Sequence, residues 1–267
     1  MSGPRPALIL PIFPLPDVTF FPHTLLPLHV FEARYRALVM DVLARDRRLA
    51  VVKLRPGFEA TYAGKPAVHA VAGAGEIVSW ERLANGRYNI LLKGEGRVRI
   101  ERERPSDTLY RLVEARRLED APPAADTTPT LARIRAACGR LLVALQRPAD
   151  LLDTALADGQ APGVIADRIA AAVLPDGDLR QELLETLDAD RRLGRVAAAL
   201  GRPGDLLDTA LAEGQAPGVI ADRVAAAVLP DGALRQELLE TLDVDRRLAR
   251  LAGALDVLVR ELSGGRG

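Results

Sequence analysis

Residues Leu8 to Glu32 read LILPIFPLPDVTFFPHTLLPLHVFE, and this stretch decides how the N-terminal half is organised. Five prolines stand in it among large apolar side chains: Pro11, Pro14, Pro16, Pro22 and Pro27. Proline cannot donate a hydrogen bond within a sheet, and it disfavours helical geometry in the residue before it. We therefore expect an extended segment with one short strand at Leu8–Phe13, and neither a long helix nor a central strand. Because its apolar side chains require burial, other elements must pack around it.

Helical spacing begins at the end of this stretch. Apolar residues recur three or four positions apart, namely Phe31, Tyr35, Leu38, Val39, Val42 and Leu43. This pattern predicts one amphipathic helix that ends near Arg45 and buries these side chains, Phe31 included.

Strand-like runs follow the predicted helix. Leu49–Leu54 is apolar enough for a buried strand, and Val68–Arg82 and Arg87–Lys93 flank the pair Asn85-Gly86. Asn-Gly between two such runs predicts a hairpin, because both positions accept positive φ. Further strands are expected at Arg97–Arg104, with one wet face, and at Tyr110–Leu118. Short strands with one early helix predict a small, mostly antiparallel barrel or folded sheet, with Ile90 and Val98 in its core.

Two stretches carry a resemblance to a known family. LPIFPLPDVTFFPHTLLPLHVFEARYRALV resembles the opening of the Lon protease N-terminal domain in its stand-alone bacterial form, and Val30–Arg36 matches the family's "IFE-RYR". GAGEIVSWERLANGRYNILLKGEGRVRIERE is similar to the family's middle section, with departures at Asn85, at Gly94-Glu95-Gly96 and at Val98. The resemblance implies an α+β fold in which a PUA-like, mostly antiparallel β-barrel precedes an all-α helical region.

A linker separates the two expected domains, 1–120 and 121–267. Ala121–Pro129 holds no large apolar residue, and Thr128 and Pro129 are suited to the N-cap and first position of a helix. One face of that helix is apolar, with Leu131, Ile134, Cys138, Leu141, Leu142 and Leu145.

An internal repeat occupies most of the C-terminal half. Residues 147–201 and 202–256 align without a gap at a period of 55 residues, and they differ only at positions 149, 158, 169, 178, 189, 194, 196, 198 and 201. The segment ADRIAAAVLPDGDLRQELLETLDADRRL is similar to the helical segment that the family carries once after its barrel. The extra copy must still bury its apolar stripes. It can stack within the chain or pair with another chain, which would form a homo-oligomer through the repeated helices.

Composition restricts the compartment and the class of protein. Of the 267 residues, 48% are hydrophobic, yet no apolar run reaches the roughly 18 residues of a membrane span. The apolar patch Ala7–Phe13 is interrupted by proline, which favours a strand over a signal peptide. The single cysteine, Cys138, excludes an internal disulfide and is expected in a core. We expect a cytoplasmic protein that does not contact membranes.

The sequence holds no recognisable catalytic motif and no complete metal-binding pattern. A phosphate-cradling G-x-x-x-x-G-K-[ST] is absent, and no serine stands in the family's nucleophile context. His29 and Glu32 are three residues apart, but a metal site requires a third ligand. Gly73-Ala74-Gly75 is followed by a strand and not by a helix, which favours strand flexibility or a bulge over a phosphate loop. We expect no catalytic residue, no metal, no cofactor and no enzymatic activity.

The resemblance leads to a function by implication. In Lon, this domain helps to capture protein substrates, so it implies a non-enzymatic module that binds protein or peptide segments, in protein quality control. Its partners would be unfolded or client protein segments, with a protease or a chaperone alongside. The candidate contact residues are apolar or aromatic: Phe20, Phe21, Leu25, Leu26, Trp80 and Tyr88. Trp80 and Tyr88 can equally form a cross-strand pair, which is the favoured interpretation of these two.

Two other functions stay open. PUA-like barrels also occur in RNA-modifying enzymes, and residues 1–120 carry 19 Lys and Arg against 14 Asp and Glu. Against RNA binding, acidic residues alternate with the basic ones and aromatic content is only 4%, so nucleic acid is the less favoured partner. The third function is a scaffold that self-associates through the duplicated helices.

Overall fold

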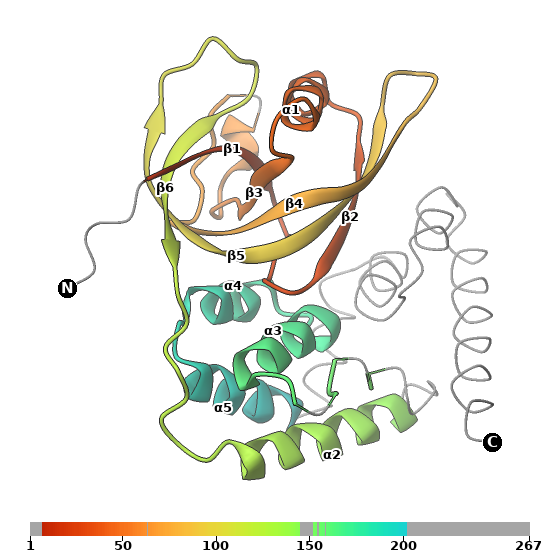
Figure 1. The fold of residues 1–267 in the computed structure, drawn as a ribbon, viewed down its shortest axis with the longest axis vertical. Coiled ribbons are helices and arrows are strands. Elements are labelled where there is room, and N and C mark those ends of the chain that lie inside the picture. The colour runs from red at the N-terminus through yellow and green to blue at the C-terminus, as the bar shows by residue number, and fades with distance from the viewer. Residues whose placement is uncertain (1–6, 63, 145–151, 154, 158, 202–267) are drawn as a thin grey trace. The chain divides into compact units, whose positions relative to one another are not determined.

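The computed structural model describes residues 7–62, 64–144, 152–153, 155–157 and 159–201 (Figure 1). Their elements are β1 (Leu8–Leu15), β2 (Leu25–Val30), α1 (Ala33–Leu43), β3 (Arg48–Lys53), η1 (Glu59–Thr61), β4 (Val71–Arg82), β5 (Tyr88–Arg104), β6 (Leu112–Leu118), α2 (Thr128–Ala144), α3 (Pro162–Val173), α4 (Gly177–Glu185) and α5 (Ala189–Leu200). None of these described helices is long and apolar enough to cross a membrane.

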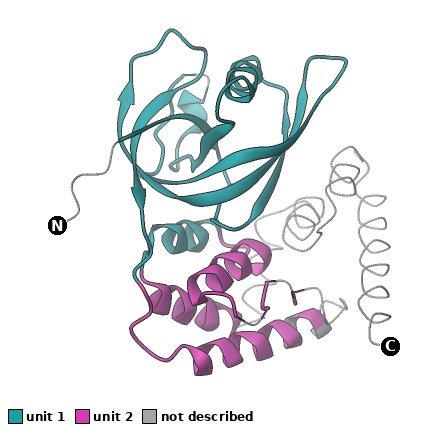
Figure 2. Ribbon diagram, in the orientation of Figure 1, with its two compact units in different colours: residues 1–121, 177–187 teal, residues 122–176, 188–267 magenta. Residues whose placement is uncertain are grey.

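The chain forms two compact units, shown in different colours in Figure 2. The first consists of residues 1–121 and 177–187, and the second of residues 122–176 and 188–267. Helix α4 therefore belongs to the unit that holds the sheet, although the repeat in which it lies was expected to be wholly part of the helical domain.

Six strands form one mostly antiparallel sheet in the order β2-β5-β4-β3-β1-β6, and β5 also pairs with β6. The expectation that prolines keep the first strand out of the sheet interior is wrong, because β1 has a neighbour on each side. Residues Leu8–Pro11 pair with β6, and Ile12–Leu15 pair in parallel with β3. Since each half of β1 has a strand on only one side in this register, a proline nitrogen that faces the other side needs no partner.

Strand β2 was not predicted. It lies at the end of the strand order and pairs with residues Tyr88–Lys93 of β5. Pro27 lies opposite Leu91 in this pairing. A proline is compatible with an edge strand because its missing N–H can face away from the ladder.

The loop between β1 and β2 packs against glycines of the sheet. A Cβ at Gly73 would lie 1.8 Å from the carbonyl oxygen of Phe20, and one at Gly94 would lie 2.1 Å from that of Phe21. Gly75 meets the Phe20 ring, and β4 has a register shift between Ala74 and Gly75. The expected bulge is therefore present, and the missing side chains let the loop backbone touch the sheet.

The hairpin at Asn85-Gly86 is confirmed, since it joins β4 to β5. Only Gly86 takes positive φ, at +75°, whereas both residues were expected to accept it. The Asn85 side chain instead accepts a hydrogen bond from the Arg87 amide at 3.0 Å. The turn thus uses asparagine for its side-chain acceptor and glycine for its backbone conformation.

Helix α1 buries Tyr35, Leu38, Val39 and Val42 as expected, but it begins two residues after Phe31. Phe31 is 59% exposed, so the prediction that its ring lies in the core is wrong. Glu32 is the N-cap and has an extended backbone. Because Phe31 precedes this residue, its side chain does not follow the helical periodicity that directs the others into the core. Ile90 and Val98 are buried, as predicted.

Replacing Phe31 with alanine should change the free energy of unfolding by less than about 0.5 kcal/mol, because surface side chains contribute little to stability. The midpoint of urea unfolding checks this. Tyr35→Ala is the control, since its buried ring stacks on Phe13 with centroids 4.1 Å apart, and it should cost about 3–5 kcal/mol. A comparable loss for Phe31→Ala would mean that its ring is covered in solution.

Unit 2 contains α2, α3 and α5. Helix α2 begins at Thr128, one residue earlier than expected, since Thr128 was predicted as the N-cap and Pro129 as the first helical residue. The Asp126 carboxylate accepts a hydrogen bond from the Thr128 amide at 2.9 Å. Asp167 of α3 and Arg192 of α5 form an ion pair whose side chains are each 1% exposed. The first repeat copy supplies α3, α4 and α5, whereas the second copy, 202–256, lies outside the described residues.

Candidate functional site

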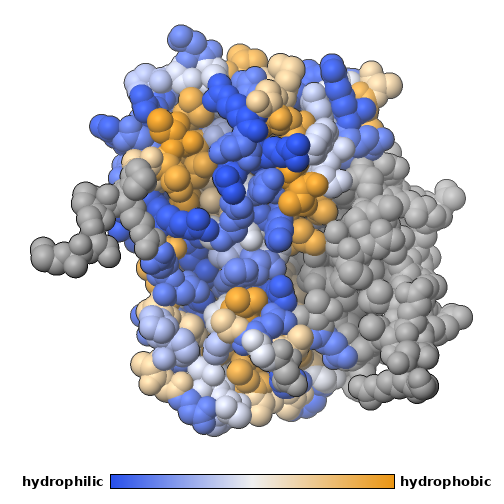
Figure 3. All heavy atoms as spheres, viewed as in Figure 1, coloured by the Kyte–Doolittle hydropathy of each residue, from blue (hydrophilic) through white to orange (hydrophobic). Residues whose placement is uncertain are grey.

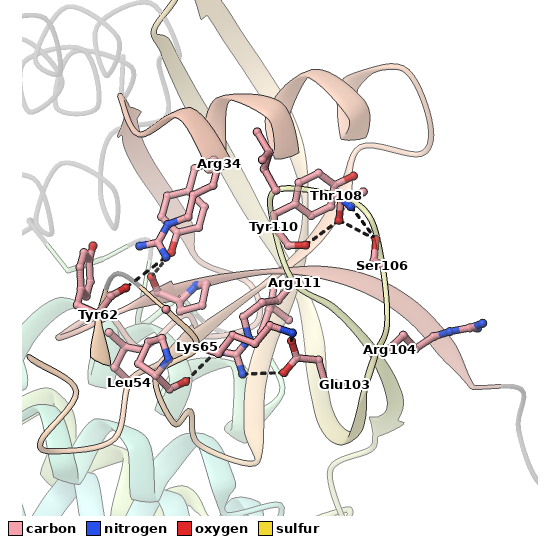
Figure 4. Close-up of a pocket in the computed structure, with 16 residues that line it drawn as sticks. Arg34, Leu54, Tyr62, Lys65, Glu103, Arg104, Ser106, Thr108, Tyr110 and Arg111 are labelled. Atoms are coloured by element: carbon pink, nitrogen blue, oxygen red, sulfur yellow. Dashed lines mark hydrogen bonds and ion pairs between the residues drawn. The ribbon is translucent and has the colours of Figure 1, made fainter. Parts of the chain in front are cut away.

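A pocket of about 160 Å³ opens in unit 1 where three segments meet (Figure 4). These are the loop from Leu54 to Pro66, the start of α1, and the end of β5 with its connection to β6, from Glu103 to Arg111. They converge because β1 lies between β3 and β6 in the sheet, so that the loops after β3 and before β6 are brought to the two sides of β1. The amide of Ile12 donates to the Arg111 carbonyl at 3.0 Å, and that of Leu54 donates to the Leu15 carbonyl at 2.9 Å.

The floor of the pocket is apolar. It consists of the buried side chains of Ile12, Pro14, Leu54 and Tyr35. At the rim, the Leu109 side chain is 69% exposed. Small-molecule sites usually measure about 300–1,000 Å³, so this pocket has the size for one apolar side chain and not for a cofactor.

One carboxylate organises the side of the pocket formed by α1. Glu32 accepts a hydrogen bond from Arg34 Nε at 2.9 Å with one oxygen and from the Tyr62 hydroxyl at 2.9 Å with the other. The Arg34 guanidinium carbon lies 4.6 Å from the Tyr35 ring centroid and 5.1 Å from that of Tyr62. This bidentate arrangement fixes a cationic wall stacked on aromatic faces.

Arg111 stands on the opposite side of the pocket and is held there by two hydrogen bonds. Its Nη1 donates to the Pro66 carbonyl at 2.8 Å, and its Nη2 donates to Glu103 at 3.2 Å. Its Nε is buried and finds no hydrogen-bond acceptor among the described residues. A buried donor without an acceptor costs free energy, so this side chain is held in the wall of the pocket at some cost in stability.

The pKa shifts in the pocket keep its groups in their ordinary protonation states. Burial raises the pKa of Tyr35 to about 12, and burial followed by the hydrogen bond to Glu32 raises the pKa of Tyr62. Burial alone would raise the pKa of Glu103, but hydrogen bonds from Arg111 and Lys65 outweigh it, so the pKa is lowered. Neutral phenols and a paired carboxylate suit binding and do not suit proton transfer near neutral pH.

The predicted contact residues do not form one cluster. Phe20, Phe21 and Tyr88 are buried, so their side chains are not available at the surface. Leu25 and Leu26 are half-buried on β2. None of the six residues lines the pocket.

Trp80 is exposed, and the Arg47 guanidinium carbon lies 4.6 Å from its ring centroid. It lies opposite Ile90 in the β4–β5 pairing, whereas Tyr88 lies opposite Arg82. The favoured cross-strand pair of Trp80 with Tyr88 is therefore not a direct one. Other exposed apolar residues include Phe31, Met40 and Leu109, and Figure 3 shows such side chains in separate patches among hydrophilic ones.

His29 and Cys138 have structural surroundings. His29 Nδ1 lies 2.7 Å from the Asn89 side-chain oxygen, while Glu32 pairs with Arg34 and Tyr62. Across the part of the chain that the structure describes, no group of three metal-binding side chains is present. Burial raises the pKa of Cys138 to about 12, which leaves its thiol unreactive near neutral pH.

Sequence reasoning missed Arg111, Tyr62 and Glu103. These residues come from two polar segments about 45 positions apart, and no local pattern links them. Only the pairing of β1 with both β3 and β6 brings them together.

Comparisons with known proteins agree on one family. A family model described as the ATP-dependent protease La (LON) substrate-binding domain matches residues 9–202. A Lon protease of Geobacter metallireducens is 31% identical over 205 residues, which cover 75% of this chain and 24% of that protein. Lon protease 2 of Bdellovibrio bacteriovorus is 28% identical over 204 residues, which cover 75% and 25%. The chain spans about a quarter of the length of these relatives.

Two solved structures share the fold. The N-terminal domain of Mycobacterium avium complex Lon protease has a TM-score of 0.60 at 17% identity, over 73% of this chain and 98% of that one. The Lon N-terminal domain protein from Xanthomonas campestris has a TM-score of 0.52 at 24% identity, over 72% and 98%. At these identities the likeness concerns the fold alone.

Proposed function

Because the chain belongs to the family of ATP-dependent protease La (LON) substrate-binding domains, we propose that it is a non-enzymatic module that binds segments of client proteins in the cytoplasm, in protein quality control. The pocket between the Leu54–Pro66 loop and the β5–β6 connection receives one apolar side chain of the client. The client would be an unfolded or loosely folded segment, because only such a segment can present a single side chain together with free main-chain oxygens.

The observation that carries the proposal is the apolar floor of the pocket, which lies between the side chains of Arg34 and Arg111. An apolar client side chain would enter the pocket, and a main-chain carbonyl of the client would lie beside the guanidinium groups of Arg34 and Arg111. Leu109 at the rim would pack on the next part of the client. The two interactions together favour an extended polypeptide over an isolated apolar molecule.

Ion pairs weaken the case for RNA as the partner. Arg48 pairs with Glu95, Arg102 with Glu114, and Arg116 with Glu101. The hydrogen bond from Arg48 lowers the pKa of Glu95, so that pair stays charged near neutral pH. Each of these basic side chains is thus held by an acidic neighbour, which a phosphate backbone would have to displace.

Leu109→Asp should weaken binding of a client at least about tenfold, because it removes the burial of one apolar side chain at the pocket rim. The probe is a fluorescein-labelled protein that has been reduced and carboxymethylated so that it cannot refold, and fluorescence anisotropy gives its Kd. The matched control is Met40→Asp, since Met40 is 56% exposed but does not line the pocket. Equal affinities for the two variants would exclude the pocket as the contact site.

A further inference from the structure

The sheet of unit 1 carries a binding surface built for one helix, α4. Gln181 donates to the Val71 carbonyl at 3.1 Å, and Arg97 of β5 donates to the Leu184 carbonyl at 2.9 Å. Arg180 donates to the Asp17 carbonyl at 3.2 Å. All three side chains are buried, so these hydrogen bonds are made away from water and fix the register of the helix on the sheet.

An ion pair marks the start of this helix. The Lys53 side chain is only 7% exposed, and its Nζ lies 2.7 Å from an Asp178 carboxylate oxygen. Asp178 is 85% exposed and is therefore hydrated, so it is the buried lysine and not the aspartate that requires the ion pair. A buried ammonium that loses its partner is costly, because its desolvation is no longer offset.

The position of Lys53 makes the carboxylate more necessary. A Cβ built on Gly177 would lie 3.0 Å from Lys53 Nζ, so the ammonium lies beside the N-terminus of α4. That end of a helix carries partial positive charge and repels a cation, whereas an acidic residue in the first turn is attracted to both. Asp178 is the acidic residue in the first turn of α4.

The second repeat copy contains the same helix sequence with one change. Residues 177–187 read GDLRQELLETL and residues 232–242 read GALRQELLETL, so Ala233 stands where the first copy has Asp178. The counterparts of the buried α4 residues Arg180, Gln181, Leu183 and Leu184 are Arg235, Gln236, Leu238 and Leu239. Every buried residue of α4 is therefore duplicated, and the single difference between the two segments is the partner of Lys53.

We propose that the sheet face around Lys53 is a sequence-specific helix-binding site, and that Asp178 determines which of the two repeat copies it binds. Placed on this site, the segment 232–242 would make the same buried contacts but would leave the Lys53 ammonium beside a helix N-terminus with no carboxylate. The site thus rejects the second copy by an unpaired buried charge, which is a common basis of specificity between near-identical partners. This inference does not depend on the proposed client-binding function.

A competition within one molecule tests the proposal. His69 Nδ1 lies 3.4 Å from Glu185 Oε1, so residue 69 reports which copy is bound. In a Cys138→Ala background, the substitutions His69→Cys, Glu185→Cys and Glu240→Cys leave one thiol just before β4 and one on each copy. A short bismaleimide then joins residue 69 to 185 or to 240, and the monomeric product is isolated by gel electrophoresis. Trypsin and mass spectrometry distinguish the copies, because the peptides after Arg180 and Arg235 differ at Ala189 and Val244.

The exchange variant combines Asp178→Ala with Ala233→Asp. It should lower the yield of the cross-link to residue 185, relative to that of the cross-link to residue 240, at least about tenfold. This is the effect of one charge-assisted hydrogen bond to a buried group. Lys53→Met provides a second measurement that holds even if the exchange variant folds poorly. Without the ammonium neither copy is penalised, and the ratio should fall in the same direction. A ratio that stays at its starting value in a folded exchange variant, or in Lys53→Met, would overturn the proposal.

Discussion

An alanine at position 73 is expected to destabilise unit 1 by about 3 kcal/mol or more, at or beyond the upper end of the usual cost of overpacking. The added Cβ would lie 1.8 Å from the Phe20 carbonyl oxygen and 2.7 Å from the carbonyl carbon. Backbone atoms cannot turn aside as a side-chain tip can. The loop that carries Phe20 and Phe21 would therefore have to lift away from the sheet, and both buried rings would be partly exposed.

The fluorescence of Trp80, the single tryptophan, follows urea unfolding of this unit and measures the effect. The matched control is Gly96→Ala in the adjacent strand. There the nearest atoms, at 3.2 Å, belong to the tip of the flexible Arg117 side chain, so a loss below about 1 kcal/mol is expected. Similar losses for the two variants would show that loss of glycine in the strands, and not contact with the loop, sets the cost.

Asp167→Ala should destabilise unit 2 by about 3–5 kcal/mol, the usual cost of removing one partner of a buried ion pair. Asp167 and Arg192 are each 1% exposed, and Arg192 Nε lies 3.4 Å from Asp167 Oδ1. The variant leaves a guanidinium buried without this carboxylate. Hydrogen exchange in peptides from α3 and α5 measures the loss within the unit concerned.

A double variant separates the ion pair from the packing. Asp167→Leu combined with Arg192→Met should recover most of the stability, because an apolar pair of similar size requires no desolvation of charge. Asp153→Ala, which removes an exposed carboxylate of the same unit, should stay within about 0.5 kcal/mol of the unaltered protein. If Asp167→Ala behaves like Asp153→Ala, the ion pair contributes nothing beyond a surface contact.

Local sequence patterns predicted those elements that depend only on residues close together in the chain. The β4–β5 hairpin depends on Gly86 and on the Asn85 side chain, and both belong to the turn itself. The helix after the linker starts where an acceptor side chain precedes Thr128. The buried face of α1 follows from 3.6-residue periodicity, and this periodicity failed only at Phe31, which lies before the helix begins.

Features that depend on distant pairings could not be predicted. The proline rule applies to a strand with neighbours along its whole length, but β1 changes its neighbour between Pro11 and Ile12. The glycines of β4 suggested a bulge, but they gave no indication that a loop backbone lies against them. The pocket likewise unites Arg34, Tyr62 and Arg111, whose proximity follows from strand order and not from any local spacing.

The return of the chain from unit 2 to supply α4 has a consequence on the ribosome. Residues 1–121 can leave the exit tunnel before Gly177 has been added, and synthesis of the intervening stretch takes roughly 3–11 s at about 5–20 residues per second. During that interval the Lys53 ammonium and the Arg97 guanidinium face water instead of α4. The first copy of the helix then emerges before the second has been translated, so the order of synthesis and the Asp178 carboxylate favour the same choice.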